Sequence, residues 1–206
     1  MRVNMIEKKE VQVWDIAVRI FHWSLVVAFA AAFVTEDDFE LLHVYAGYLV
    51  LGLISFRVIW GLIGTRHARF SDFVCGIKTT ELYLKSILTG NPKHYLGHNP
   101  AGGMMILVML VSLFLLSYSG LATYAEDGKG PLAQTEISIV ATAYAHDSHR
   151  RSSKGEFWEE IHEFLANFTL LLIFLHLAGV AVSSLVHREN LVRAMMTGKK
   201  YRGEKN

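Results

Sequence analysis

The chain has 206 residues, of which 52% are apolar and 19% are charged, and its formal net charge is +1. A soluble domain typically carries more charge than this. The near-neutral balance argues against nucleic acid or another polyanion as a partner. Because the apolar residues gather in four long blocks, we expect a single integral membrane domain over residues 1–206.

The four apolar blocks run over about residues 16–34, 41–64, 103–123 and 161–186. Each block offers roughly the 20 residues that a helix needs to cross the hydrocarbon core. Backbone polar groups find no water in lipid, so each block should be a helix that satisfies its own hydrogen bonds. The predicted fold class is therefore all-α, an integral membrane four-helix bundle with membrane lipid around it.

The first block resembles a signal peptide, because residues 1–10 are polar and basic and the apolar run reaches Ala28-Phe29-Ala30. However, Arg19 and His22 interrupt that run, and acidic residues follow at 36–40. A leader needs an uninterrupted apolar centre. We therefore expect the first block to be a retained membrane helix.

Basic residues lie mainly in the N-terminus, in the loop 65–102 and in the tail after residue 187. The short loop 35–40 has none, and the loop 124–160 mixes its basic residues with at least as many acids. The positive-inside rule then predicts a multi-pass protein of the bacterial inner (plasma) membrane with both termini cytoplasmic. Residues 79–89 look amphipathic, which predicts a short interfacial helix.

Four of the ten histidines lie inside or at the edges of the apolar blocks: His22, His43, His162 and His176. Ionisable side chains at membrane depth are costly, so each is a functional candidate. A lone histidine bonded to a neighbouring carbonyl would be an equally good explanation for any one of them. The four together are harder to dismiss, because their depths match in pairs.

His162 and His176 are fourteen residues apart on the fourth block. Fourteen residues give a rise of about 21 Å and nearly four full helical turns, so the two side chains share one face at two depths. His43, at the outer end of its block, is level with His162. His22, near the inner end of its block, is level with His176. The pattern predicts two bis-histidine sites, one above the other in the bundle core.

The type of ligand indicates the metal. Two neutral imidazoles without a carboxylate or thiolate suit a low-spin haem iron, whereas a zinc or di-iron site wants more, closely grouped ligands. The single cysteine, Cys75, and the lack of a C-x-x-C-H motif exclude covalent haem attachment. We therefore predict two haem b groups. The acids Glu159, Glu160 and Glu163 around His162 are interpreted as a solvated helix start, where the helix dipole favours them.

Two arginines are candidate cofactor-binding residues beside the inner site. Arg57 comes fourteen residues after the histidine of its own block, so it should face the same way at the depth of the inner haem and pair with a propionate. Snorkelling to the cytoplasmic interface is the alternative. Arg19, one turn before His22, is a second candidate. Three glycines would let a macrocycle or a neighbouring helix approach closely: Gly47, Gly120 and Gly179.

The remaining six histidines are expected in loops or at the interface. His146 and His149 of the outer loop could bind a metal, although a solvated loop explains them as well. Four others fall on the cytoplasmic side: His67, His94, His98 and His187. The first three of these could supply protons to a quinone near the inner haem, because histidine titrates near neutral pH. The pair Gly102-Gly103 would let the flat quinone ring approach.

Several short motifs occur in a familiar order: Val13-Trp14-Asp15, Arg19-x-Phe21-His22-Trp23, His43-x-x-x-Gly47, Phe56-Arg57-x-Ile59-Trp60-Gly61, Arg66-His67-Ala68-Arg69-Phe70, Gly97-His98-Asn99-Pro100 and His176-x-x-Gly179-Val180. Through them the sequence resembles the bacterial cytochrome b561 family, which includes the cytochrome b subunits of nickel–iron hydrogenases. The resemblance covers nearly the whole chain except the outer loop of about residues 124–157.

The resemblance implies a four-helix bundle whose chain ends are cytoplasmic and which holds two haems b. The family's ligand positions match His22, His43, His162 and His176. The resemblance also implies electron exchange between the membrane quinone pool and a partner redox protein. These are expectations for the structure and the comparisons to test.

The leading hypothesis is an electron-transfer subunit of a respiratory chain rather than a stand-alone enzyme. A periplasmic c-type cytochrome or oxidoreductase subunit would dock near the outer haem, and electrons would pass through the inner haem to or from quinone. The alternative is a superoxide-oxidising quinone reductase at the outer face, but that needs a basic outer rim and the rim here is acidic. A transporter with a histidine proton relay is a third hypothesis, although buried carboxylates are lacking in the sequence.

Overall fold

The structure is a computed structural model that describes residues 10–36, 39–90, 92–133 and 153–201. Its elements, in chain order, are β1 (Glu10–Gln12), α1 (Ile16–Val34), α2 (Glu40–Ile63), a 3₁₀ turn (Arg66–Ala68), α3 (Phe70–Phe73), α4 (Ile77–Leu88), α5 (Pro100–Glu126), α6 (Gly130–Ala133), α7 (Ser153–His187), α8 (Leu191–Thr197) and β2 (Lys199–Tyr201).

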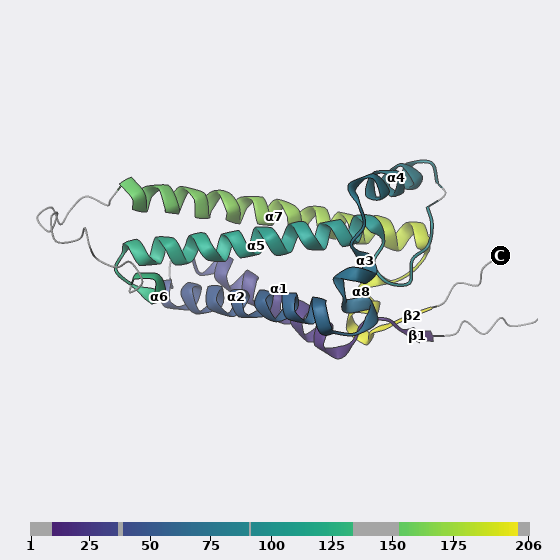
Figure 1. Cartoon of the computed structure of the whole chain (residues 1–206), viewed down its shortest axis with the longest axis horizontal. Coiled ribbons are helices and arrows are strands. Elements are labelled where there is room, and N and C mark those ends of the chain that lie inside the picture. Colours follow the sequence, from purple (N-terminus) through teal and green to yellow (C-terminus); the bar gives the residue numbers. More distant parts are fainter. Residues whose placement is uncertain (1–9, 37–38, 91, 134–152, 202–206) are drawn as a thin grey trace, which may run out of the picture.

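Four helices, α1, α2, α5 and α7, are long and apolar enough to cross a membrane, and they run along the length of the molecule (Figure 1). Most of their apolar side chains point outward rather than into the bundle, as lipid-facing helices require. The predicted all-α membrane bundle is confirmed.

The helices α5 and α7 begin earlier than the apolar pattern predicts. The helix α5 begins at Pro100, because the Asn99 side chain accepts a hydrogen bond of 2.7 Å from the Gly102 N–H and proline suits the first helical turn. The helix α7 begins at Ser153, eight residues before the expected start of the apolar block. Hydropathy marks where the lipid begins, whereas a helix continues into water for as long as its polar residues support it.

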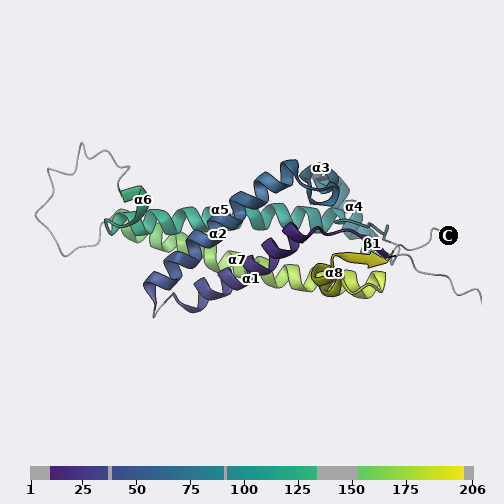
Figure 2. The ribbon, with the colours of Figure 1, turned by 90° about the horizontal axis from the view of Figure 1, so that it is seen from below.

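The bundle consists of two helical hairpins, α1 with α2 and α5 with α7, joined by contacts between α2 and α5 (Figures 1 and 2). A small apolar core forms where α1, α2 and α5 meet: Ala28, Val50, Ile54 and Leu113. Between α5 and α7, the buried hydroxyls of Ser112 and Thr169 hydrogen-bond at 2.7 Å. Small polar side chains of this kind let membrane helices approach closely and satisfy each other.

Both described chain ends lie at the same end of the bundle, called the terminal end here, together with α3, α4 and α8 (Figure 1). The strands β1 and β2 pair antiparallel there, with Glu10 opposite Tyr201. The carbonyl of Gly198 accepts hydrogen bonds from the backbone N–H groups of Val13 and Trp14. The opposite end, called the far end, carries the α1–α2 connection and α6. The C-terminal tail is therefore fixed against the segment that starts α1.

The helix α4 packs on α5, where the Thr80 hydroxyl donates to the Pro100 carbonyl at 3.4 Å, and its buried Tyr83 contacts Tyr95 and His187. On a neighbouring face it exposes Ile77, Leu84 and Leu88. Its bounds, Ile77–Leu88, lie two residues and one residue before those of the expected helix 79–89. Its position at the membrane surface stays a prediction.

Asp15 joins three elements at the terminal end. Its carboxylate accepts a hydrogen bond from the Val18 N–H, which caps α1, and further bonds from the Trp60 indole and the Thr65 hydroxyl. Burial alone would raise the pKa of this carboxyl, but the hydrogen bonds from Thr65, Val18 and Trp60 outweigh burial and lower the pKa below its ordinary value. Asp15 therefore stays ionised and holds α1 against the end of α2.

We expect Asp15→Ala to destabilise the protein by about 1–2 kcal/mol, because it removes a helix cap and two side-chain hydrogen bonds. Since the folded-state pKa is depressed, this contribution is present at neutral pH and is lost as the pH falls through the folded pKa. Urea unfolding in detergent at neutral pH measures the difference. The exposed Asp127, at the C-terminus of α5, provides the control Asp127→Ala. Equal stability of the two variants would contradict the assigned role.

Candidate functional site

The four membrane histidines face one another in two pairs. His22 of α1 faces His176 of α7, with ring centroids 6.5 Å apart. His43 of α2 faces His162 of α7, with ring centroids 6.0 Å apart. The first pair lies toward the terminal end and the second lies toward the far end. Each pair therefore joins α7 to one helix of the first hairpin.

The spacing of both pairs fits two imidazoles on opposite sides of one metal ion. An imidazole nitrogen bound at about 2 Å places its ring centre about 3 Å from the metal, so two opposed ring centres are about 6 Å apart. In the described ranges, no group of three or more His, Cys, Asp or Glu side chains could hold a metal ion by itself. The remaining coordination positions would have to come from a cofactor, as the porphyrin nitrogens of haem provide.

The helix surface beside two of these histidines is open. A Cβ atom added at Gly47, four residues after His43, would meet nothing within 4 Å, and the same holds at Gly179, three residues after His176. These positions fit the close approach of a flat group. Gly120 differs, because a Cβ atom there would lie 2.8 Å from Cε1 of His162. Gly120 therefore makes room for the His162 ring itself.

The far-end pair is oriented by backbone carbonyls. The Nδ1 of His43 lies 2.8 Å from the Ala32 carbonyl oxygen, and the Nδ1 of His162 lies 3.1 Å from that of Leu116. A carbonyl oxygen can only accept, so Nδ1 carries the proton in both rings and Nε2 is left as the metal-binding atom. The Ser119 hydroxyl, which donates to the same Leu116 carbonyl, lies 3.0 Å from Nδ1 of His162. Such outer bonds fix a ligand's tautomer and orientation.

The terminal-end pair has different surroundings. Among the described residues, four buried side-chain nitrogen atoms lack a hydrogen-bond partner: Arg19 Nε, His22 Nδ1, Arg57 Nη1 and His98 Nδ1. All four belong to the segments that gather at the terminal end. Buried donors are nearly always satisfied in folded proteins, so this group fits a site that a cofactor completes.

Arg57 is buried inside the protein, with 3% of its surface exposed. Its guanidinium carbon lies 5.1 Å from the ring centroid of Phe70 and 5.9 Å from that of Phe73. These are cation–π distances. The side chain does not extend to the surface as snorkelling would require. Arg19 is held differently, because its Nη1 donates a 2.6 Å hydrogen bond to the Met196 carbonyl of α8.

His98 lies between two aromatic rings just before α5. Its ring centroid is 4.3 Å from that of Trp14 and 4.6 Å from that of Phe73. Burial, together with the positive charges of Arg57 and Lys200, lowers the pKa of His98 to about 3. Its imidazole is therefore neutral at physiological pH, with one N–H to donate.

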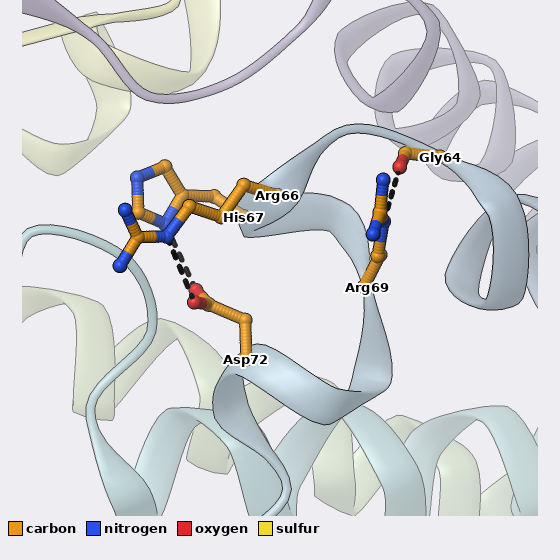
Figure 3. Close-up of polar contacts among 5 residues, drawn as sticks. All are labelled: Gly64, Arg66, His67, Arg69 and Asp72. Atoms are coloured by element: carbon orange, nitrogen blue, oxygen red, sulfur yellow. Dashed lines mark hydrogen bonds and ion pairs between the residues drawn. The ribbon is translucent and has the colours of Figure 1, made fainter.

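The other histidines of the terminal end have partners. The Nδ1 of His67 lies 2.9 Å from the Asp72 carboxylate, which also attracts Arg66 at 3.7 Å, while Arg69 donates to the Gly64 carbonyl (Figure 3). This arrangement folds the loop after α2 into a compact turn, and it leaves the His67–Asp72 pair at the surface of the terminal end.

Two further histidines are bound on the C-terminal side of this region. His94 lies 2.8 Å from Glu189, and His187 lies 3.3 Å from the Tyr83 hydroxyl. The three histidines predicted to act together therefore have three different surroundings, with only His98 in an apolar one. The outer-loop residues His146 and His149 lie outside the described residues.

The proposed role of the Gly102-Gly103 pair needs revision. A Cβ atom at Gly103 would lie 2.5 Å from the Phe73 carbonyl oxygen, and one at Gly102 would lie 3.3 Å from the Asn99 side-chain oxygen. The surface of Gly103 is occupied by α3 and is not free for a quinone ring. Gly103 is small because α3 packs on α5 at that point.

Comparisons with known proteins identify the family of the chain. Residues 13–198 match the family described as prokaryotic cytochrome b561. The chain belongs to this family. The match includes all four paired histidines and begins at Val13, next to Trp14. No solved structure matches the chain significantly.

Three curated relatives align over almost the whole chain, and each is named a probable Ni/Fe-hydrogenase B-type cytochrome subunit. The protein from Azotobacter chroococcum mcd 1 is 24% identical over 218 residues, covering 91% of this chain and 87% of its own length. That from Rhizobium leguminosarum bv. viciae is 24% identical over 227 residues, covering 95% and 90%. That from Rhodobacter capsulatus is 23% identical over 226 residues, covering 93% and 81%.

The chain is thus a member of a family of b-type cytochromes that carry electrons across membranes, and it is a multi-pass bacterial membrane protein. The sequence did not point to the carbonyls of Ala32 and Leu116, because backbone acceptors leave no trace in a side-chain pattern. It did not point to Ser119 either, because the contact of its hydroxyl with His162 joins two helices that are far apart in the chain.

We expect Gly120→Ala to lower the haem content of the protein, because the added methyl group would push the His162 ring out of line. Haem per chain is measured by pyridine haemochrome assay. Gly52→Ala is the matched control, since a Cβ atom there meets nothing within 4 Å. Unchanged haem content and spectrum in Gly120→Ala would contradict this steric role.

Proposed function

We propose that the chain binds two haems b, one at each histidine pair, and conducts electrons between the two faces of the membrane. The facing of His22 with His176 and of His43 with His162, at centroid separations of 6.5 and 6.0 Å, carries this proposal. Haem iron held by two imidazoles takes up and releases one electron without a change of ligands. The protein supplies binding, orientation and electrostatics.

The helix α7 sets the distance between the two sites. It contributes one ligand to each pair, fourteen residues apart, which corresponds to about 21 Å along a helix axis. A continuous helix keeps that distance constant. The hydrogen bonds of His43 and His162 to carbonyls keep each Nε2 directed into the site, so little rearrangement is needed when the charge of the site changes.

The terminal end is proposed to face the cytoplasm. The loop between α2 and α5 and the tail after α7 carry most of the basic residues, and the positive-inside rule assigns such segments to the cytoplasmic side. The acidic far end would then face the periplasm.

The far end offers an acidic surface for a redox partner. Glu159, Glu160 and Glu163 are exposed there at the start of α7, close to His162. Glu40 is bound to Lys129, so it adds less to this surface. Charge complementarity favours a partner with a basic haem edge or cluster edge. The relatives' names, Ni/Fe-hydrogenase B-type cytochrome subunits, support an oxidoreductase subunit as the partner, which the proposed orientation would place in the periplasm. A c-type cytochrome is the other proposed partner. The same acidity disfavours superoxide as a substrate.

Arg57 and Arg19 are proposed to bind propionates of the haem at the terminal end. Both guanidinium groups are permanently charged and keep a buried nitrogen without a partner. Carboxylates are the anions that guanidinium groups bind best, through paired hydrogen bonds.

A quinone is the proposed acceptor or donor at the terminal end. The pair formed by His67 and Asp72 supports this placement, because quinone reduction consumes protons and a histidine beside a carboxylate can pass them from the water. His67 lies in the turn between α2 and α3 and Asp72 lies in α3, at the same end of the bundle as Arg57.

Each pair of ligands should behave as one site. We expect His43→Ala and His162→Ala to lose the same haem, and His22→Ala and His176→Ala to lose the other, because each iron needs both imidazoles. Haemochrome assays should give two haems per wild-type chain and one in each variant, with matching spectra within a pair. A spectrum of His43→Ala that matched His176→Ala would contradict the pairing.

The quinone proposal predicts that His67→Ala slows quinone reduction at least about tenfold while both haems are kept. The reason is the loss of the proton-carrying group. Stopped-flow reoxidation of the haems by a soluble quinone measures the rate. Arg66→Ala is the matched control. It removes another partner of Asp72, but arginine stays protonated at neutral pH and so cannot pass a proton to the quinone. An unchanged rate in His67→Ala would remove this residue from the proposal.

A further inference from the structure

The buried group at the terminal end has an excess of positive charge. In the described part of the chain, no carboxylate lies within ion-pair distance of Arg19 or Arg57. The carboxylate of Asp15 interacts electrostatically with Arg57 and offsets part of its charge, but the hydrogen bonds that it accepts come from Val18, Trp60 and Thr65. Nη1 of Arg57 and Nε of Arg19 are left without an acceptor, and a further anion would satisfy them.

Glu189 does not fill this need. Its carboxylate lies 2.8 Å from His94 and 3.5 Å from the buried Lys200, so it is already paired with these two groups. Arg19 and Arg57 are the two cations with a buried nitrogen that has no hydrogen-bond partner among the described residues. His98 also has a buried nitrogen without a partner there, and this neutral ring is an electrostatic neighbour of Arg57.

His98 and Arg57 share an aromatic neighbour. The ring centroid of Phe73 lies 4.6 Å from that of His98 and 5.9 Å from the guanidinium carbon of Arg57, so both groups contact the same ring. His98 interacts electrostatically with Arg57 and Lys200, and more weakly with His67 and with His176 of the terminal-end pair. What distinguishes it from His67 is its buried position between the Trp14 and Phe73 rings and its unpartnered Nδ1.

The His98 ring is fixed before any ligand arrives. Trp14 covers one side of it at 4.3 Å, and Trp14 is itself held by a backbone hydrogen bond of 3.0 Å to Gly198 and by Lys200 above its ring. A ring held in this way loses little conformational freedom on binding, which makes it a good fixed donor.

We propose that His98, together with Arg57, binds a propionate carboxylate of the haem at the terminal end. This inference rests on the proposed function, since it needs a haem there. A carboxylate would balance the excess positive charge of the arginines and would also accept a hydrogen bond from His98. A quinone headgroup is neutral, so it could accept from His98 but would not balance the charge.

A hydrogen bond from His98 to the propionate would change the reduction potential of the terminal-end haem. A propionate without a donor keeps its full negative charge near the iron and favours the ferric state, whereas a donated hydrogen bond disperses part of that charge. His98 should therefore raise the potential of the terminal-end haem. The haem at the far-end pair lies beyond its reach and should not respond.

The test compares His98→Phe, which keeps the aromatic packing but removes the donor, with His98→Gln, which keeps an N–H donor. The control is His94→Phe, which removes a histidine of the same end that Glu189 already binds. Redox titration followed by visible spectra gives both potentials, and His162→Ala spectra assign them. We expect His98→Phe to shift only the terminal-end haem to a more negative potential, His98→Gln to reverse most of the shift, and His94→Phe to leave both unchanged.

Wild-type potentials in His98→Phe would overturn this inference and leave the proposed function standing. If quinone reduction were lost in the same variant, His98 would be assigned to the quinone. A wild-type chain without haem would instead overturn the proposed function. If His98→Phe fails to accumulate in membranes, wild-type protein stripped of haem is reconstituted with iron protoporphyrin IX dimethyl ester. We expect weaker binding of the ester than of protohaem, with the larger loss at the terminal-end pair. Equal losses at the two pairs would overturn the inference.

Discussion

Burial of imidazole and guanidinium groups at membrane depth is the constraint on which the rest of this structure depends. Each such group needs a hydrogen-bond partner or a ligand, because lipid supplies none. At the far end the partners are backbone carbonyls, which bind Nδ1 of His43 and His162 and leave Nε2 free. At the terminal end several nitrogens keep no partner among the described residues, so the same constraint points there to a bound anion.

The arrangement of the helices follows from this. Direct packing joins α1 to α2, α2 to α5 and α5 to α7, while α7 meets α1 and α2 through histidine pairs. Beside His43 and His176 the helix surface is open at Gly47 and Gly179, as the proposed haems would require. Where helices touch, a small residue leaves room for the neighbouring helix, as Gly103 of α5 does for α3.

The two chain ends serve the terminal-end site rather than merely flanking it. Strand β2 and α8 hold the segment that contains Trp14, which in turn covers His98, and α8 also binds Arg19 through the Met196 carbonyl. The far end has no such brace among the described residues, and its exposed acids suit a separate partner instead. The terminal end thus fits contact with a cofactor inside the protein, and the far end fits contact with another protein.

The sequence by itself determined the four membrane helices and the family, because length, hydropathy and motif order are properties of the chain. The fourteen-residue spacing on α7 also predicted which histidines should be level, since helical rise and twist are fixed. Only the tertiary structure decided the partners of each ring: the Leu116 carbonyl, the Ser119 hydroxyl, and the aromatic rings on either side of His98. It also buried His98 while leaving His67 and His94 paired with carboxylates, and it gave Gly103 a packing role. Contacts between distant segments such as residues 14, 73 and 98 depend on how the loops fold back, which no local pattern encodes.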